Sequence, residues 1–183
     1  MYHAIKNIIR ISILTSAALL MMIGLFAAPA PAAAYVDMGT TISIPSIEVE
    51  APIVRIGIRA FPNGDVSWDT TRLTRQVGFL EGMSWFGEGG NIVLGGHSEL
   101  TNRTPAVFYR LNEVAVGDEI IVTQGDITWR YTVIQLREVG VRDLSILYPT
   151  NSERLTIMTC DINSFTGSAY SRRTVIIARR ASN

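Results

Sequence analysis

Residues 35–183 contain one cysteine, Cys160, and one histidine, His97, and each ends an apolar run. Cys160 closes Leu155-Thr-Ile-Met-Thr-Cys, and His97 closes Asn91-Ile-Val-Leu-Gly-Gly-His, whose glycines allow close backbone approach. A cysteine nucleophile needs a base or an ion-pair partner, because a thiol with an ordinary pKa of about 8.5 is mostly protonated at neutral pH. The pair therefore meets the minimum for acyl transfer through a thiol. Taken singly, Cys160 could be a small buried side chain and His97 a surface residue without a role.

Arg173 could supply the third group that acyl transfer needs. It precedes the apolar run Thr174-Val-Ile-Ile-Ala, and the 12 residues 161–172 that separate it from Cys160 are enough for a hairpin that sets the two side by side. The reaction passes through a tetrahedral oxyanion, which a permanently charged guanidinium can stabilise. The simpler interpretation is an arginine that pairs with a surface carboxylate.

The elements that must position these residues are short strands. The runs are rich in Ile, Val and Thr, are bounded by turn residues, and show no βαβ rhythm, so a β-barrel or β-sandwich is expected. Gly125-Asp126 predicts a tight hairpin, and short helices are expected near residues 72–77 and 105–111. The predicted strands are residues 41–44, 53–56, 91–95, 119–123, 128–138, 155–159 and 174–178.

The start of the chain predicts export. Residues 11–28 carry no charge and follow Lys6 and Arg10, and residues 29–34 form a Pro/Ala linker. A stretch of this length lies between a signal peptide and a membrane-spanning helix, so both a cleaved signal and a retained anchor fit. The positive-inside rule keeps the two basic residues in the cytoplasm and delivers residues 35–183 outside the membrane.

Composition excludes several classes of function. Without Lys6 and Arg10 the chain has 14 basic and 16 acidic residues, a net charge of −2, so no nucleic-acid partner is expected. A single cysteine rules out an intramolecular disulfide, and one Cys with one His makes a poor zinc set, so no metal site or cofactor is predicted. Calcium could bind loop carboxylates such as Asp143 or Glu153, although no spacing requires it.

Three motifs, taken together, resemble the sortase family. Ile42-Ser-Ile-Pro-Ser-Ile is similar to its opening strand, Phe86-Gly-Glu-Gly-Gly-Asn-Ile-Val-Leu-Gly-Gly-His to its histidine motif, and the run ending at Cys160 to its cysteine motif. In the family's final motif the arginine precedes three strand residues and an apolar-small pair, here Ile177-Ala178, which selects Arg173 over Arg172. Alternation along a strand supports this choice only weakly.

The resemblance implies a mainly β fold: a closed eight-strand barrel with short helices in residues 35–183, preceded in residues 1–34 by an export or anchor helix. It implies Cys160 as nucleophile, His97 as acid/base and Arg173 as oxyanion stabiliser. The expected partners are surface proteins with a C-terminal sorting signal, cut between Thr and Gly, and an amine acceptor such as a cell-wall precursor, at the outer face of the cell membrane. Residues 141–153 match the region that helps to hold the peptide.

Two other functions remain open on the sequence. An exported cysteine peptidase differs only in that water attacks the thioester. The papain order, Cys before His, and the Ser-His-Gly-x-Cys pattern of L,D-transpeptidases are both missing. A non-catalytic exported barrel that binds a peptide is the second alternative, and a readily alkylated Cys160 would count against it.

Overall fold

The computed structural model describes residues 35–182. The predicted anchor helix and the predicted domain boundary at residue 34 lie outside these residues. Within residues 35–182, no helix has the length and apolar character that crossing a membrane requires.

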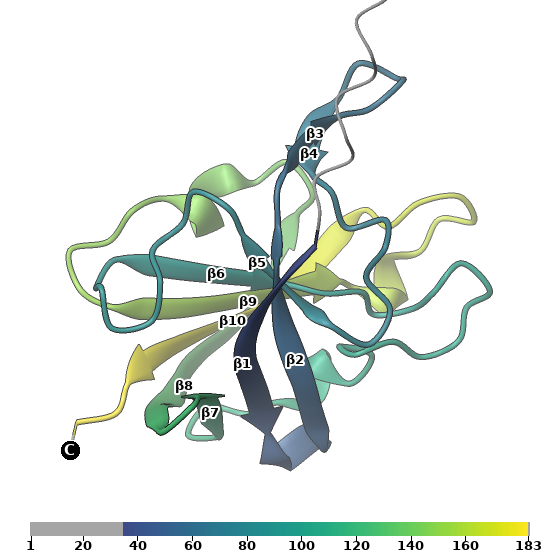
Figure 1. Ribbon diagram of the computed structural model, residues 1–183. Helices are drawn as coiled ribbons and strands as arrows, with labels where there is room; N and C mark the ends of the chain where they lie inside the picture. Colours follow the sequence, from purple (N-terminus) through teal and green to yellow (C-terminus); the bar gives the residue numbers. More distant parts are fainter. Residues whose placement is uncertain (1–34, 183) are drawn as a thin grey trace, which may run out of the picture. The chain divides into compact units, whose positions relative to one another are not determined.

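Eight strands form a closed barrel in the order β1-β2-β5-β6-β9-β10-β8-β7, and the β7–β1 pair closes it. The predicted eight-strand barrel is therefore confirmed. The remaining two strands, β3 and β4, form a hairpin of their own, which extends away from the barrel at the top of Figure 1. The strands are β1 (Val36–Ile44), β2 (Val49–Ile56), β3 (Ile58–Ala60), β4 (Val66–Trp68), β5 (Val77–Leu80), β6 (Asn91–Gly95), β7 (Glu119–Gln124), β8 (Ile127–Gly140), β9 (Arg154–Cys160) and β10 (Arg172–Arg180).

Alternating side chains fill the barrel. Along the first half of β8, Trp129, Tyr131 and Val133 are buried and the residues between them are exposed, as expected for strands with one face on a core. The same core takes fully buried residues from most of the other strands, among them Ile42, Ile53, Ile92, Leu94, Ile120, Leu155 and Ile176. At the predicted hairpin, Gly125 has φ of 55° and joins β7 to β8 through a two-residue turn.

The predicted helices at residues 72–77 and 105–111 are wrong. The first segment is a turn that leads into β5, and the second is a series of turns that ends in one short 3₁₀ helix. The helices present in the described residues are all 3₁₀ turns: η1 (Pro45–Ile47), η2 (Leu111–Glu113), η3 (Leu144–Leu147) and η4 (Ile162–Ser164).

Two parallel pairs interrupt an otherwise antiparallel barrel. β5 lies parallel to β2, and β6 lies parallel to β9. Because parallel strands end at the same edge of a sheet, the residues that follow β6 and close β9 meet at one end of the barrel. These are the ends at which the sequence places His97 and Cys160.

Candidate active site

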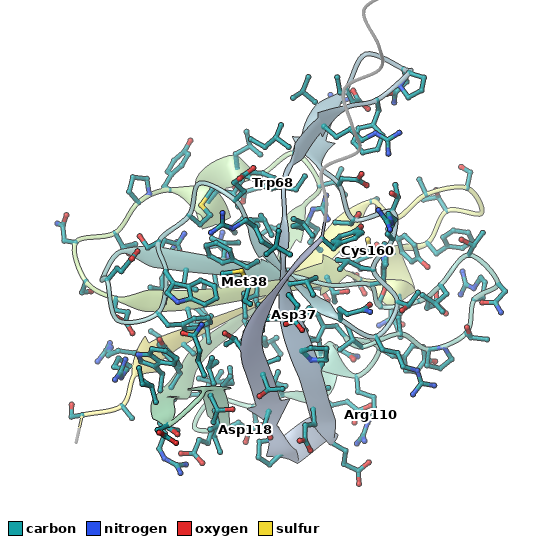
Figure 2. All side chains as sticks on the ribbon, in the orientation of Figure 1. Asp37, Met38, Trp68, Arg110, Asp118 and Cys160 are labelled. Carbon is teal, nitrogen blue, oxygen red and sulfur yellow. The ribbon has the colours of Figure 1, made fainter. Side chains whose placement is uncertain are left out.

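Cys160 is the last residue of β9, and its thiol is half-buried. Figure 2 labels it on the side of the barrel where the β9–β10 connection lies. The next residue, Asp161, accepts a hydrogen bond from the amide of Asn163 and so caps the short helix η4. Because the chain turns at this point, the strand ends with the thiol at its edge.

Arg173 lies directly opposite Cys160 in the antiparallel β9–β10 ladder. Residues paired in this way project from the same face of a sheet, with Cβ atoms about 4.5–5.5 Å apart. The hairpin predicted from the 12-residue spacing is present, and it brings a cation to the thiol.

Arg172 lies on the other face of β10 and has a different role. Its guanidinium is 2.8 Å from the buried carboxylate of Asp161 and 2.9 Å from Glu138. Since these two ion pairs engage Arg172, Arg173 is the arginine of the pair that can serve the thiol. This geometry supports the choice made from the sequence.

Burial raises the pKa of the Cys160 thiol, and the charge of Arg173 opposes that shift. A buried thiolate is disfavoured because it loses water, whereas a neighbouring cation stabilises it. The resting side chain is therefore mainly the thiol at neutral pH. For this sulfur to act as a nucleophile, a base would have to take its proton.

His97 follows β6, which runs parallel to β9 with Gly95 opposite Met158. The ladder continues past the strand, because the amide of Gly96 donates to the Met158 carbonyl (3.2 Å) and the Thr159 hydroxyl donates to the Gly96 carbonyl (2.8 Å). Extending this register by one more residue puts His97 level with Cys160. The structure thus brings the three predicted site residues to one end of neighbouring strands.

Gly96 gives the backbone room at this position. A Cβ on Gly96 would lie 2.7 Å from Cδ2 of Phe108 and 2.8 Å from Cγ1 of Val107, closer than side chains approach. The amide of Phe108 in turn donates to the carbonyl of His97 (3.0 Å). The close approach expected of the Gly-Gly pair is confirmed at Gly96, whereas a Cβ on Gly95 would make only ordinary contacts, the nearest 3.5 Å from Leu80.

Within residues 35–182, the imidazole of His97 makes one hydrogen bond, between Nε2 and the carbonyl oxygen of Thr70, at 2.9 Å. This contact could not be predicted from the sequence, because a main-chain carbonyl leaves no signal in residue types. A weaker signal was present at Asp69 and Thr71, since Asp-x-Thr is typical of a local turn closed by the carboxylate.

A cluster of four residues joins the two loops beside the site, and we call it the loop clasp: Glu99, Arg103, Phe165 and Tyr170. The Tyr170 hydroxyl donates to the Glu99 carboxylate, which Arg103 also approaches at 3.4 Å. The Arg103 guanidinium lies 4.4 Å from the centre of the Phe165 ring, which packs on Tyr170 at 5.1 Å. Burial, together with the Glu99 contact, raises the pKa of Tyr170 to about 12. The clasp ties the loop after His97 to the β9–β10 connection.

Residues 141–153, expected to help hold a peptide, contain η3. Asp143 caps this turn by accepting from the amide of Ser145. The side-chain amide of Asn91 holds the segment by donating to the carbonyls of Ile146 (2.9 Å) and Tyr148 (3.1 Å). Since Asn91 is also the first residue of β6, it attaches residues 141–153 to the strand that His97 follows.

The two carboxylates considered for calcium have protein partners. Asp143 lies 3.6 Å from Arg137, and Glu153 accepts from the Tyr131 hydroxyl (2.6 Å) and pairs with Arg180 (3.1 Å). Across the part of the chain that the structure describes, no group of three His, Cys, Asp or Glu side chains is placed to hold a metal ion.

A comparison with known proteins finds a relative among the sortases. The chain is 29% identical over 142 residues to sortase D of Bacillus subtilis (strain 168), a match that covers 76% of this chain and 62% of that protein. It therefore spans less than two thirds of the length of this curated relative.

Solved structures give the same family name. A sortase A lid mutant from Corynebacterium diphtheriae matches with a TM-score of 0.64 and 27% identity, over 84% of this chain and 75% of that one. Sortase C1 from Streptococcus agalactiae matches with a TM-score of 0.62 and 27% identity, over 80% and 68%. The family model of the Sortase domain matches residues 42–181, which include all three predicted site residues and nearly the whole barrel. The chain therefore belongs to the sortase family.

Proposed function

We propose that this protein is an extracytoplasmic cysteine transpeptidase that cleaves a sorting signal in surface proteins and transfers the acyl group to an amine. The observation that carries the proposal is the pairing of Arg173 with Cys160 at the end of the barrel where His97 follows the neighbouring strand. Membership of the sortase family supports the reaction class.

In the first half of the reaction, the Cys160 sulfur attacks the scissile carbonyl carbon. His97 takes the thiol proton as the C–S bond forms, since burial raises the pKa of the thiol. The carbonyl oxygen becomes an oxyanion, to which Arg173 donates. When the C–N bond breaks, His97 gives the proton to the departing amine and a thioester remains on Cys160.

In the second half, an acceptor amine attacks the thioester carbonyl. A new C–N bond forms, the C–S bond breaks, and the proton lost by the amine passes by way of His97 to the leaving sulfur. Arg173 stabilises the second oxyanion as it did the first. If water attacks instead, the same residues hydrolyse the peptide, so the choice of nucleophile decides between transpeptidase and peptidase.

The experiment that tests this function is mass spectrometry of the products formed from a library of sorting-signal peptides, with and without amine acceptors. The expected product carries the acceptor on the new C-terminal Thr and is absent with Cys160→Ala. Free acid alone, at every acceptor concentration, would identify a peptidase. No product with the folded protein, at any acceptor concentration, would favour the non-catalytic peptide-binding barrel.

The proposed location outside the membrane rests on the apolar residues 11–28 and on Lys6 and Arg10. Cys160 is the single cysteine of the chain, so it reports the location directly. In intact cells, a membrane-impermeant maleimide should label Cys160 as completely as a permeant one. Labelling by the permeant reagent alone would place the domain in the cytoplasm and end this part of the proposal.

A further inference from the structure

The contact between His97 and Thr70 fixes which ring nitrogen carries the proton. A carbonyl oxygen can only accept a hydrogen bond, so Nε2 of His97, 2.9 Å from the Thr70 oxygen, must be the donor. In the neutral ring, Nδ1 then has the lone pair and is the nitrogen available to the thiol. A base for Cys160 needs this arrangement, because a nitrogen that already carries a proton cannot take another.

The Thr70 carbonyl is held by a turn built around the carboxylate of Asp69. One carboxylate oxygen accepts from the amide (3.1 Å) and from the hydroxyl of Thr71, and the other accepts from Nη1 of Arg59 at 3.1 Å. The Asp69 side chain is 3% exposed. The Thr71 hydroxyl, helped by the Thr71 amide and by Arg59, holds the pKa of Asp69 below its usual range although burial opposes the shift. The carboxylate is therefore ionised at neutral pH.

Main-chain bonds complete the turn. The Asp69 amide donates to the Gly57 carbonyl (2.9 Å), and the Thr70 oxygen that meets His97 also accepts from the amide of Leu73 (3.0 Å). The Tyr35 hydroxyl donates to the Asp69 carbonyl (2.9 Å) and accepts from the Arg72 amide (2.7 Å). Residues 69–73 thus have a defined shape without belonging to a helix or strand.

The Asp69 carboxylate is buried although it is ionised, and a buried charge needs hydrogen-bond donors to offset the water that it loses. Here the three donors close residues 69–71 into a turn whose middle carbonyl faces His97. We propose that Asp69 is a positioning residue for the reaction: its carboxylate shapes the 69–73 turn so that the Thr70 carbonyl keeps the His97 proton on Nε2 and presents Nδ1 to Cys160.

The importance of this role for turnover rests on the proposed function of His97, but the proton position does not. The test is therefore NMR of the imidazole nitrogens. His3 and His97 are the only histidines of the chain, so the full chain with His3→Gln and ¹⁵N-labelled histidine has a single imidazole. At a pH where the ring is neutral, the expected spectrum shows a protonated Nε2 and an unprotonated Nδ1. A ring protonated at Nδ1 would overturn the proposal.

Matched variants connect the turn to the tautomer. Thr71→Val removes a hydroxyl that bonds Asp69, Thr71→Ser keeps it, and Thr74→Val removes a hydroxyl of the same loop that bonds only Gln76. Thr71→Val should mix the two tautomers and lower kcat about 10-fold or more, since a displacement of about 1 Å can cost about 10²-fold. Thr71→Ser and Thr74→Val should keep the spectrum of the parent.

Asp69→Ala should have the larger effect, provided that thermal unfolding shows a folded protein. If it does not fold, the Thr71 pair decides. Equal spectra and equal kcat for Thr71→Val and Thr71→Ser would show that the turn does not set the proton position. If instead the proposed function is wrong, the His97 spectrum would still respond to these variants as expected. Neither the parent nor any variant would then turn over a sorting peptide.

Discussion

Arg173 and Cys160 are directly paired across the β9–β10 ladder, whereas Arg172, one residue earlier, is held by Asp161 and Glu138 on the opposite face. Two adjacent residues of the same type therefore have separable roles. Arg173 faces the thiol, where we propose that it stabilises the oxyanion, and Arg172 holds the carboxylate of Asp161 in the turn that follows the thiol. Because the two arginines have different partners, a variant of Arg172 can serve as the control for a variant of Arg173.

Arg173→Ala should lower kcat by about 10²–10³, the usual cost of losing one oxyanion donor, with a much smaller change in KM. Arg173→Lys should recover little, because a point ammonium cannot replace a planar group with several donors. Steady-state kinetics with a fluorogenic sorting peptide measures both.

Arg172→Gln is the matched control for Arg173. It should keep most activity but lower the stability, because the buried Asp161 loses its cation. An inactive Arg172→Gln that is folded, beside an active Arg173→Ala, would move the oxyanion role by one residue. Activity in both variants would remove it from the pair.

The pH dependence of Cys160 alkylation should follow the two opposing influences on its pKa. Burial raises that pKa, so the rate with iodoacetamide should reach its midpoint at a higher pH than for free cysteine. Arg173 favours the thiolate, so Arg173→Ala should move the midpoint higher still, and Arg172→Gln should leave it in place. A midpoint that falls in Arg173→Ala would contradict the placement of this cation.

Cys160→Ala should abolish turnover and leave the unfolding temperature close to that of the parent, since the thiol ends a strand and is only half-buried. Circular dichroism and product analysis measure the two effects. Undiminished cleavage by the folded variant would end the proposal that Cys160 forms the thioester.

His97→Ala should lower kcat by about 10²–10⁴, the range typical of acid–base catalysis. The barrel should remain folded, because the imidazole bonds a carbonyl in a turn outside the barrel strands. A loss below about tenfold would show that His97 is not the acid/base group.

The sequence was enough to predict which three side chains would lie at the same end of the barrel. Cys160, His97 and Arg173 each adjoin an apolar strand, and a short antiparallel hairpin leaves few ways to place Arg173 except beside Cys160. The barrel followed from many short strands and from the family resemblance.

Strand β5 and the Thr70 contact could not be predicted from the sequence, for physical reasons. All four residues of β5 are buried, so the strand lacks the alternation that marks a half-exposed strand and is not among the predicted strands; only its first residue, Val77, lies in a predicted helix. It pairs in parallel with β2, a contact that no local turn announces. The hydrogen bond between His97 and Thr70 joins residues 27 positions apart. Its acceptor is a main-chain carbonyl, which every residue has, so the residue types do not reveal it.

Gly96 and Gly95 give a second pair of neighbours whose roles the structure separates. Gly96→Ala adds a Cβ 2.7 Å from the ring of Phe108, which is fully buried, so Phe108 or the backbone must shift. The main-chain amide of Phe108 donates to the His97 carbonyl, so such a shift would also move His97. Overpacking of this kind typically costs about 1–3 kcal/mol in the free energy of unfolding.

Gly95→Ala meets Leu80 and Met158 only at 3.5 Å and beyond, so urea denaturation should show a much smaller cost for it. Activity should follow the same order, because the movement forced at Gly96 is transmitted to His97 and displaces its ring from Cys160. Equal losses of stability in the two variants would mean that the backbone at Gly96 can relax away from Phe108. Reduced activity in Gly96→Ala at full stability would still indicate displacement of His97, and a fully active and fully stable Gly96→Ala would show that the close approach is not needed.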